Sequence, residues 1–417
     1  MRILFLTDNF PPETNAPASR TYEHAKCWVA AGHRVTVVTG APNFPSGRIH
    51  AGYRNRLWLR EAMDGIDVVR VWTYITANEG FLKRTLDYLS FMVSAIIASS
   101  FLSRPDVIVA TSPQFFTPCA AWVVSLLRWR PFVFELRDLW PDSIVAVGAM
   151  RETWIVRWLR KVEYFLYRRA ARIVSVTQSF KRVLIANGVD GNRIAVVPNG
   201  VDLDTYLPGP KPISLARRLG VEGKFVAAYV GTVGMAHGIG TLLDAAKALQ
   251  RRADIAFVVV GTGAEQAALA EKSGREGLVN VVFVGAVSKA EVRDYWRLCD
   301  AAVVLLRDAP LFRHVVPSKI FEAMGMERPI ILGVRGESEA IVLASGAGMT
   351  IPPEDADALA HAVAELADDR QRGIALGAKG RRFASENFDR SALAMRMLNE
   401  LELVGAHKHA AGHRHHR

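Results

Sequence analysis

Cysteine is scarce in this chain of 417 residues. The three cysteines, Cys27, Cys119 and Cys299, are far apart and odd in number. Neither a disulfide framework nor the paired spacing of a zinc site fits them. The sequence therefore predicts a protein of a reducing compartment.

Long apolar segments are also missing. Residues 88–103 carry no charge and follow Lys83 and Arg84, but these sixteen residues fall short of the roughly 20 that a spanning helix needs. We interpret the segment either as a buried helix of an α/β domain or as a helix partly inserted into lipid. The first residues, MRILFLTD, lack the length and cleavage site of a signal peptide, so we expect the protein on the cytoplasmic side of the membrane.

Two common binding motifs are absent. The glycine-rich turns do not match G-x-G-x-x-G, which argues against a dinucleotide site. No cluster of His, Asp or Glu has metal-ligand spacing, and we expect no metal. Asp202 and Asp204 form an Asp-x-Asp, but they lie in a connection rich in Pro and Gly and are interpreted as a turn.

Positive charge is present and unevenly distributed. Residues 1–205 hold 25 Lys and Arg against 17 Asp and Glu, whereas residues 206–405 hold 24 of each. An excess in one half favours an anionic partner for that half, either nucleic acid or an anionic membrane surface. No nucleic-acid recognition motif accompanies the charge, so we expect the membrane and not nucleic acid.

The segment 151–172 supports that choice. It holds seven cations, two acids and several aromatic residues. On a helix, Ile155, Trp158, Leu159, Val162 and Leu166 share one face, and Arg157, Lys161 and Arg168 share another. This pattern is typical of a helix lying in a membrane interface, and also of a core-facing helix with a solvated basic side.

Short apolar runs alternate with helical patterns along the whole chain. The runs are β-branched and continuous, as in parallel strands that are buried on both faces. The pattern occurs twice and predicts an α/β fold of two Rossmann-like, doubly wound parallel sheets facing a cleft. We place a first domain at 1–205, a second at 206–390, a helix at 391–405 and a disordered His-rich tail at 406–417.

The second half offers two features that suit a phosphate. Gly231, with Gly234, Gly238 and Gly240, forms one strand-to-helix turn, and Gly261 with Gly263 forms another. Pro317, Ser318 and Lys319 stand at a predicted helix start, where Ser318 can cap and Lys319 adds a charge. Glu322, about one turn later, could accept hydrogen bonds from a diol such as a ribose. A capped core helix explains the same residues equally well.

The first half has polar residues at two strand ends. The first loop lacks glycine and leads through Asn15 and Ala16 into a helix. The run FELRDLWPDS ends another strand. Charged residues at the end of a buried strand indicate a functional site more often than part of the hydrophobic core, since ligands of such folds lie at the carboxyl ends of strands. The charged residues of this run are Glu135, Arg137, Asp138 and Asp142.

Over nearly all of residues 1–400 the chain resembles a retaining family-4 glycosyltransferase of the GT-B fold. The motifs that carry the resemblance are FPPETNAPASR, ELRDLWPDSI, VPNGVD, VGTVGMAHGIGTLLDAA, FVGAVSKAEVRDYWRLCDAAVVLL and VPSKIFEAMGMERPII. It is most similar to the N-acetyl-L-fucosamine-transferase-like (WbuB-like) branch, whose members build surface polysaccharides.

The resemblance implies a nucleotide-sugar donor that is held mainly by the second domain, and we expect its nucleotide to be UDP. Glu322 matches the second Glu of the family's paired-glutamate motif and would hold the ribose hydroxyls. Ser318 and Lys319 would face the pyrophosphate, and the base would lie near Ala286 and Val287. Asp138 and Arg137 match the polar pair near the sugar or the acceptor, and the C-terminal helix would return to the first domain.

Departures from the family pattern concern the same site. Thr232 and His237 stand where the family often has Arg and Lys, and His314 stands where it has the first Glu. Lys319 and Arg313 could replace the missing cations, and a protonated His237 could do so as well.

The resemblance implies glycosyl transfer with retained configuration. The segments 88–103 and 151–172 lead us to expect a polyprenyl-pyrophosphate-linked acceptor at the cytoplasmic face of the membrane. The alternatives are a GT-B epimerase, with Glu135 and Asp142 as acid and base, and an inactive scaffold of the same fold.

Overall fold

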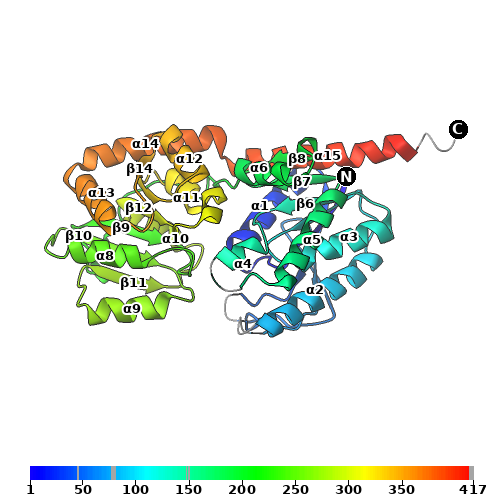
Figure 1. Cartoon of the computed structure of the whole chain (residues 1–417), viewed down its shortest axis with the longest axis horizontal. Coiled ribbons are helices and arrows are strands. Elements are labelled where there is room, and N and C mark those ends of the chain that lie inside the picture. The colour runs from blue at the N-terminus through cyan, green and yellow to red at the C-terminus, as the bar shows by residue number, and fades with distance from the viewer. Residues whose placement is uncertain (45–46, 77–80, 147, 149–150, 413–417) are drawn as a thin grey trace. The chain divides into compact units, whose positions relative to one another are not determined.

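A computed structural model of the chain describes residues 1–44, 47–76, 81–146, 148 and 151–412 (Figure 1). The chain divides into two compact units: Met1–Pro198 with Arg390–Arg417, and Asn199–Asp389. The boundary between the two units, at Pro198 and Asn199, thus lies a few residues before the predicted boundary at 205. Asp202 lies just after it and accepts hydrogen bonds from the N–H groups of Asp204 and Thr205, both at 3.1 Å, so the Asp-x-Asp is a turn as predicted.

The first unit is built on an eight-stranded sheet of order β3-β4-β2-β1-β5-β6-β7-β8. All neighbouring strands are parallel except β3 and β4. The strands are β1 (Arg2–Leu6), β2 (Arg34–Gly40), β3 (Trp58–Met63), β4 (Ile66–Val71), β5 (Val107–Thr111), β6 (Phe132–Leu136), β7 (Arg172–Ser175) and β8 (Ile194–Val196).

Helices cover both faces of this sheet. Helices α2, α3 and α5 form one layer, and α1 packs against α15 in another (Figure 1). The helices of the unit are α1 (Ala16–Ala30), α2 (Phe81–Phe101), α3 (Phe116–Arg128), α4 (Asp142–Ala146), α5 (Trp154–Arg169), α6 (Gln178–Ala186), the 3₁₀ helix η1 (Gly191–Arg193) and α15 (Arg390–Gly412). No helix of the described residues is long and apolar enough to cross a membrane.

Burial of the strands on both faces of the sheet explains the continuous apolar runs in the sequence. Every residue of β5 and β6 is buried. Ile3 and Phe5 of β1 join the cluster beneath α1 and α15, whereas Leu4 and Leu6, also buried, alternate with them along the strand and point to the other face. A strand between two helical layers has no solvent face, and the polar alternation disappears.

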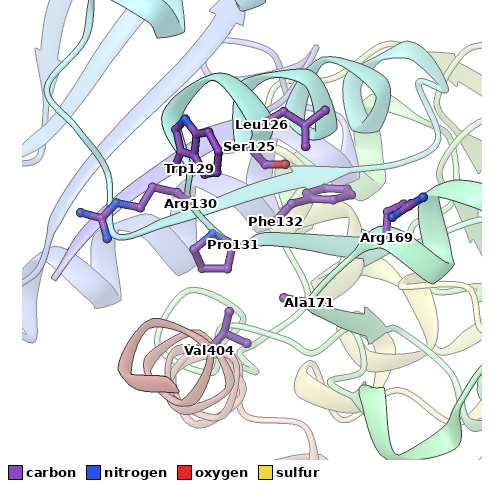
Figure 2. Close-up of a pocket in the computed structure, with 9 residues that line it drawn as sticks. All are labelled: Ser125, Leu126, Trp129, Arg130, Pro131, Phe132, Arg169, Ala171 and Val404. Atoms are coloured by element: carbon purple, nitrogen blue, oxygen red, sulfur yellow. The ribbon is translucent and has the colours of Figure 1, made fainter. Parts of the chain in front are cut away.

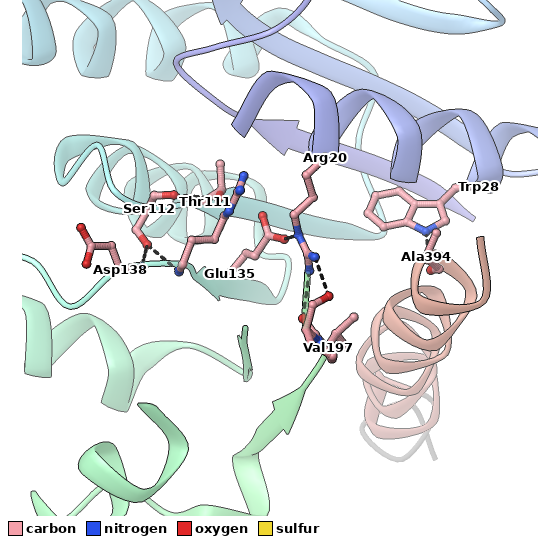
Figure 3. Close-up of polar contacts among 10 residues, drawn as sticks. Arg20, Trp28, Thr111, Ser112, Glu135, Asp138, Val197 and Ala394 are labelled. Carbon is pink, nitrogen blue, oxygen red and sulfur yellow. Dashed lines mark hydrogen bonds and ion pairs between the residues drawn. The ribbon is translucent and has the colours of Figure 1, made fainter. Parts of the chain in front are cut away.

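The C-terminal helix belongs to the first unit. Trp28 of α1 donates a hydrogen bond from Nε1 to the carbonyl oxygen of Ala394, at 2.8 Å (Figure 3). Helix α15 continues to Gly412, beyond residue 405, where the helix was expected to end. Residues 413–417 of that tail lie outside the described residues.

The second unit has a six-stranded parallel sheet of order β11-β10-β9-β12-β13-β14. Its strands are β9 (Phe225–Val230), β10 (Ile255–Val260), β11 (Val281–Gly285), β12 (Ala301–Leu305), β13 (Ile330–Gly333) and β14 (Gly348–Thr350). Its helices are α7 (Ile213–Arg218), α8 (Gly240–Ala248), α9 (Gln266–Arg275), α10 (Val292–Leu298), η2 (Pro310–His314), α11 (Lys319–Gly325), α12 (Glu337–Ser345), α13 (Ala356–Asp368) and α14 (Arg370–Asn387).

Candidate functional site

Three neighbouring strands of the second unit end in glycine at the same edge of the sheet. Gly231, Gly261 and Gly285 follow or end β9, β10 and β11, with φ angles of 141°, 128° and 84°. Residues other than glycine rarely adopt such φ angles. The N–H of Gly231 donates to the carbonyl oxygen of Val260 at 2.9 Å, and that of Gly261 donates to Gly285 at 2.8 Å. The predicted glycine turns thus meet at one place.

Glycine is required here by close backbone contact. A Cβ atom at Gly261 would lie 2.0 Å from the carbonyl oxygen of Gly231, and one at Gly263 would lie 2.2 Å from that of Val233. The clashing atoms belong to backbone, so they cannot move aside as a flexible side chain would.

We expect Gly261→Ala to destabilise the second unit by about 3 kcal/mol, because the methyl group clashes and the φ angle is unfavourable for alanine. Gly240→Ala is the matched control: its Cβ meets nothing within 4 Å, and it begins α8. Thermal unfolding followed by circular dichroism measures both. Equal melting temperatures for the two variants would contradict the packing described.

Lys319 brings an ammonium group to this glycine edge. Its Nζ atom lies 3.7 Å from the centre of the Tyr229 ring and would be 2.9 Å from a Cβ at Gly231. The side chain is buried, and Nζ has no hydrogen-bond partner. Burial lowers the pKa of Lys319 to about 7, and Glu322 opposes this shift. A buried donor without an acceptor beside backbone turns is suited to an anion.

Glu322 is the half-buried residue of α11, whose other central side chains face the core. Its Oε2 accepts a hydrogen bond from Nε1 of Trp296 at 3.2 Å. Trp296 is itself buried and comes from α10. This bond fixes one carboxylate oxygen about one helical turn from Lys319, as the sequence predicted for an acid beside a cation.

His237 does not supply a positive charge. Burial and the nearby Lys319 lower its pKa to about 3, so the imidazole is neutral at physiological pH. Its ring lies edge-on to Tyr229, with 6.1 Å between centroids. The prediction that a protonated His237 replaces a missing cation is therefore wrong. Thr232, in the same loop, is exposed and accepts a hydrogen bond at its carbonyl oxygen from the Tyr229 hydroxyl.

The segment before α11 differs from expectation in one respect. Ser318 has the helical angles φ −60° and ψ −25°, and its side chain makes no capping hydrogen bond. A capping hydroxyl needs an extended backbone to reach the next turn, so the predicted cap is wrong. Pro317 precedes it, and His314 ends η2. Arg313, the second cation suggested for the pyrophosphate, is exposed. It forms an ion pair in which its Nη2 lies 3.6 Å from Oδ1 of Asp308.

Ala286 and Val287 follow β11 directly, beside the Gly261 turn. Ala286 is exposed and Val287 half-buried. Their position at the same edge as Gly231 leaves a predicted base-binding role open to test.

In the first unit, Arg137 and Asp138 follow β6. Ser112, after the neighbouring β5, accepts hydrogen bonds at Oγ from both backbone N–H groups, at 2.8 and 3.3 Å (Figure 3). Burial raises the pKa of Asp138 to about 6, although hydrogen bonds from Ser143 and Leu139 oppose this. Burial also lowers the pKa of Arg137 to about 10, and its Nη1 is a buried donor without a partner.

The two carboxylates suggested for an epimerase are both in ion pairs. Glu135 lies within β6, fully buried, 2.7 Å from Nε of Arg20 (Figure 3). Although burial alone raises its pKa, Arg20 and Arg137 together hold it below the usual value. Asp142 pairs with Arg160 at 2.6 Å. The lowered pKa makes Glu135 a poor proton donor, which disfavours the epimerase.

Asn15 has a structural task. It is the N-cap of α1, where its Oδ1 accepts from the N–H of Ala18 at 3.0 Å and its Nδ2 donates to Oδ1 of Asn9 at 2.7 Å. Ala16 is the first residue of the helix. The side-chain groups of Asn15 are thus already bonded within the loop.

A cavity of about 580 Å³ lies at the opposite edge of the first sheet (Figure 2). Pro131 and Phe132 stand at the start of β6 and Ala171 just before β7, so the cavity is at the amino ends of the strands. Trp129 and Val404 line it further. Because Asp138 lies at the carboxyl ends, this cavity is separate from the candidate site.

Helices α2 and α5 expose apolar side chains to solvent. On α2 the exposed apolar side chains recur at helical spacing, opposite the buried Phe91 and Ala95. On α5, Ile155 and Trp158 point outward. Of the apolar face predicted for this helix, only Leu159 and Leu166 are buried. The predicted apolar face is thus partly buried and partly exposed. We call the exposed set the outer apolar surface: Leu86, Val93, Ile97 and Phe101 of α2, Leu126, Leu127 and Trp129 at the end of α3, and Trp154, Trp158 and Phe165 of α5.

Sequence reasoning missed Tyr229 and Trp296, which support Lys319 and Glu322. Tyr229 lies in the apolar run of β9 and Trp296 in the short helix α10, and in neither place does an aromatic residue indicate that it contacts a charge. Among the described residues, no group of three or more His, Cys, Asp or Glu could hold a metal ion.

Comparison with known proteins supplies the class. Residues 15–200 match the family described as glycosyl transferase 4-like domain, and residues 224–369 match glycosyl transferases group 1. The chain is 22% identical over 414 residues to WcaI of Escherichia coli K12, named for a glycosyl transferase of colanic acid biosynthesis, covering 96% of this chain and 100% of WcaI. It is 25% identical to WbjE of Pseudomonas aeruginosa, named as a glycosyltransferase, over 67% of this chain and 70% of WbjE.

The fold has solved counterparts. HepE of Anabaena, in complex with UDP and glucose, superposes with a TM-score of 0.74 at 21% identity, covering 96% of this chain and 99% of HepE. Its likeness establishes the GT-B fold of two parallel-sheet α/β domains. With a glycosyltransferase domain matched in each unit, the chain belongs to the glycosyltransferases and is an enzyme of that class.

Proposed function

We propose that the protein transfers a sugar from a UDP-sugar to a lipid-linked glycan, with retention of configuration, in surface polysaccharide assembly. The donor occupies the glycine edge of the second unit. The observation that carries this assignment is Lys319, a buried ammonium without a hydrogen-bond partner, set between the Gly231 turn and Glu322. The proteins named WcaI and WbjE, and HepE with bound UDP, support the class of donor and product.

Two parts of the donor contact different residues of the site. The diphosphate lies against the Gly231 turn and Lys319, and the ribose hydroxyls donate to Glu322. As the bond between sugar and phosphate breaks, negative charge grows on UDP, and Lys319 stabilises it without a metal ion. Chelation by EDTA is therefore expected to leave turnover unchanged.

Asp138 and Arg137 serve the acceptor or the transferred sugar from the first unit. Arg137 offers a buried donor to an anionic or hydroxyl oxygen. Asp138, with its pKa near 6, is largely ionised at neutral pH and can accept a hydrogen bond from a hydroxyl. We further propose that the donor carries an N-acetylated amino or deoxy sugar, as in the N-acetyl-L-fucosamine-transferase-like branch.

The acceptor is a polyprenyl-pyrophosphate-linked sugar, and the protein works at the cytoplasmic face of the membrane. The outer apolar surface is the support, because it places two exposed tryptophans, 71% and 56% accessible, beside the exposed cations of α5. Amphipathic rings next to Lys and Arg suit the interface of an anionic bilayer.

We expect Trp154→Ser with Trp158→Ser to weaken binding to anionic liposomes about tenfold per residue, since each indole loses its apolar burial in lipid. Trp58→Ser, an exposed tryptophan on β3, is the control. Cosedimentation at low salt, with and without anionic lipid, provides the measurement. Unchanged sedimentation of the double variant would remove the membrane part of the proposal.

The transfer itself is tested by incubating the protein with UDP-, GDP- and dTDP-sugars and extracted bacterial lipid-linked glycans. A mass gain of one sugar on the glycan, only with UDP-sugars, is the expected outcome. NMR of the new anomeric proton reads the configuration. Donor consumed while the glycan mass stays the same would refute transfer.

A further inference from the structure

A second pocket of the first unit has features of a carbohydrate subsite. Its cavity of about 500 Å³ lies after β4 and the loop that follows β2, at the carboxyl ends of the strands. Gly47, Arg48, Ile49, Asn55, Trp72, Thr73, Tyr74 and Ile75 line it. It therefore shares the edge at which Asp8 follows β1 and Asp138 follows β6.

Two aromatic rings are exposed together in this pocket. Trp72 and Tyr74 are 39% and 42% accessible, whereas Thr73 between them is buried. Both side chains line the pocket, two residues apart in the chain, and we call the pair the platform. Large aromatic side chains left open in a concave site are typical of binding pockets.

The walls of the pocket are held by specific hydrogen bonds. Asn55 uses both ends of its amide on Thr73: Nδ2 donates to the carbonyl oxygen at 2.7 Å, and Oδ1 accepts from the N–H at 3.2 Å. The N–H of Tyr74 donates to Oγ of Ser90 on α2 at 2.7 Å. The platform is thus fixed to two other segments before any ligand arrives, which lowers the entropy cost of binding.

The loop after β2 is fixed in the same way. Buried Glu13 accepts at Oε1 from the N–H groups of Asn43 and Phe44, at 2.8 and 2.9 Å. Buried Arg70 donates to the carbonyl oxygen of Gly40 at 3.1 Å and lies over the ring of Tyr53. These contacts tie the pocket to the loop that leads from β1 into α1.

We propose that this pocket binds a sugar residue of the acceptor glycan, distant from the residue that receives the new sugar. The inference rests on the proposed function for the existence of a glycan acceptor. A sugar ring has an apolar C–H face that packs on an indole, and hydroxyl edges that pair with polar groups such as Arg48. Four strand spacings of ~4.8 Å separate β4 from β6, so the pocket is roughly 19 Å from Asp138.

Saturation-transfer NMR with octyl glucoside and octyl N-acetylglucosaminide, below their micelle concentrations, tests the inference. The sugar protons are expected to be saturated more than the octyl protons. Trp72→Ala and Tyr74→Ala should each reduce sugar saturation at least fivefold, and Trp72→Tyr should restore part of it. Ile374→Ser, exposed on α14 of the second unit, should leave it unchanged.

Titration with UDP separates this inference from the proposed function. Wild-type UDP affinity in the Trp72 and Tyr74 variants shows that they are folded. Sugar saturation equal to wild type in those variants, saturation of the octyl chain alone, or none in the wild type would each overturn the inference. Loss of sugar saturation in the variants, with a wild type that binds no UDP, would refute the donor site and leave the carbohydrate pocket standing.

Discussion

Glu322→Gln is expected to raise the KM for the UDP-sugar by two to three orders of magnitude, with a small change in kcat. Hydrogen bonds from two ribose hydroxyls to a carboxylate contribute about 1.5–3 kcal/mol each, and the neutral amide loses much of this. The ribose is held equally before and during the reaction, so the loss appears in KM. Glutamine can still accept the hydrogen bond from Trp296, which preserves the local fold.

The control for this variant is Glu327→Gln. Glu327 follows α11 and is exposed, with an Oε1 atom 3.8 Å from Nε of Arg381. Its kinetics should match the wild type. Steady-state rates at varied donor concentration measure both variants, and a fall in kcat at unchanged KM for Glu322→Gln would assign it a chemical role in place of the binding role.

Lys319→Met is expected to lower kcat about a thousandfold, because the leaving diphosphate loses its buried cation. Methionine keeps an unbranched apolar chain over Tyr229, so the packing survives. The KM should change less, since the charge on UDP grows mainly as the bond breaks. Rapid-quench measurement of single turnovers isolates this step from product release.

The pKa of Lys319 gives the same variant a second signature. The folded pKa of about 7 lies below the ordinary 10.5, so between these values the unfolded chain binds the extra proton. Stability of the wild type therefore rises with pH across this window. Lys319→Met removes that slope and should raise the melting temperature at pH 7. A lower melting temperature would show that the ammonium stabilises the fold.

Donor binding should also take up a proton. A diphosphate against Lys319 favours the ammonium and raises its pKa, so at pH 8 binding of UDP draws about one proton from the buffer. Calorimetry in two buffers of different ionisation enthalpy reads this number, and the Lys319→Met variant should show none. UDP affinity in the wild type should fall as the pH rises above 7.

Much of the fold follows from the sequence because burial on both faces leaves a clear mark. The runs predicted as strands are strands, since continuous β-branched segments have few other stable arrangements in an α/β protein. Strand β14 was missed, and so was β3. It lies at the sheet edge, antiparallel to β4, and joins it through Asp64 and Gly65, both at positive φ. An Asp-Gly pair between strands is the usual sign of a tight hairpin, and it was available in the sequence.

The candidate site was predictable in part. Lys319 and Glu322 were suggested by their spacing and a helix start, which is local information that fits a capped core helix equally well, and their roles came from the family resemblance. The contact of Lys319 with Tyr229 and Gly231 joins segments about 90 residues apart and depends on the sheet order β9-β12-β13, which no local pattern reveals. Burial first and Lys319 second keep His237 neutral, and neither can be read from the residue type, so the suggestion of a protonated His237 was wrong.

Thermal unfolding of the wild type and Glu322→Gln with UDP, GDP, dTDP and ADP tests the central claim most directly. A nucleotide at 100 times its Kd adds roughly 2.7 kcal/mol to the free energy of unfolding. The account predicts that UDP stabilises the wild type most and that Glu322→Gln loses most of this gain. Stabilisation by none of the four nucleotides, or an equal gain in the variant, would contradict a donor site at Lys319 and Glu322.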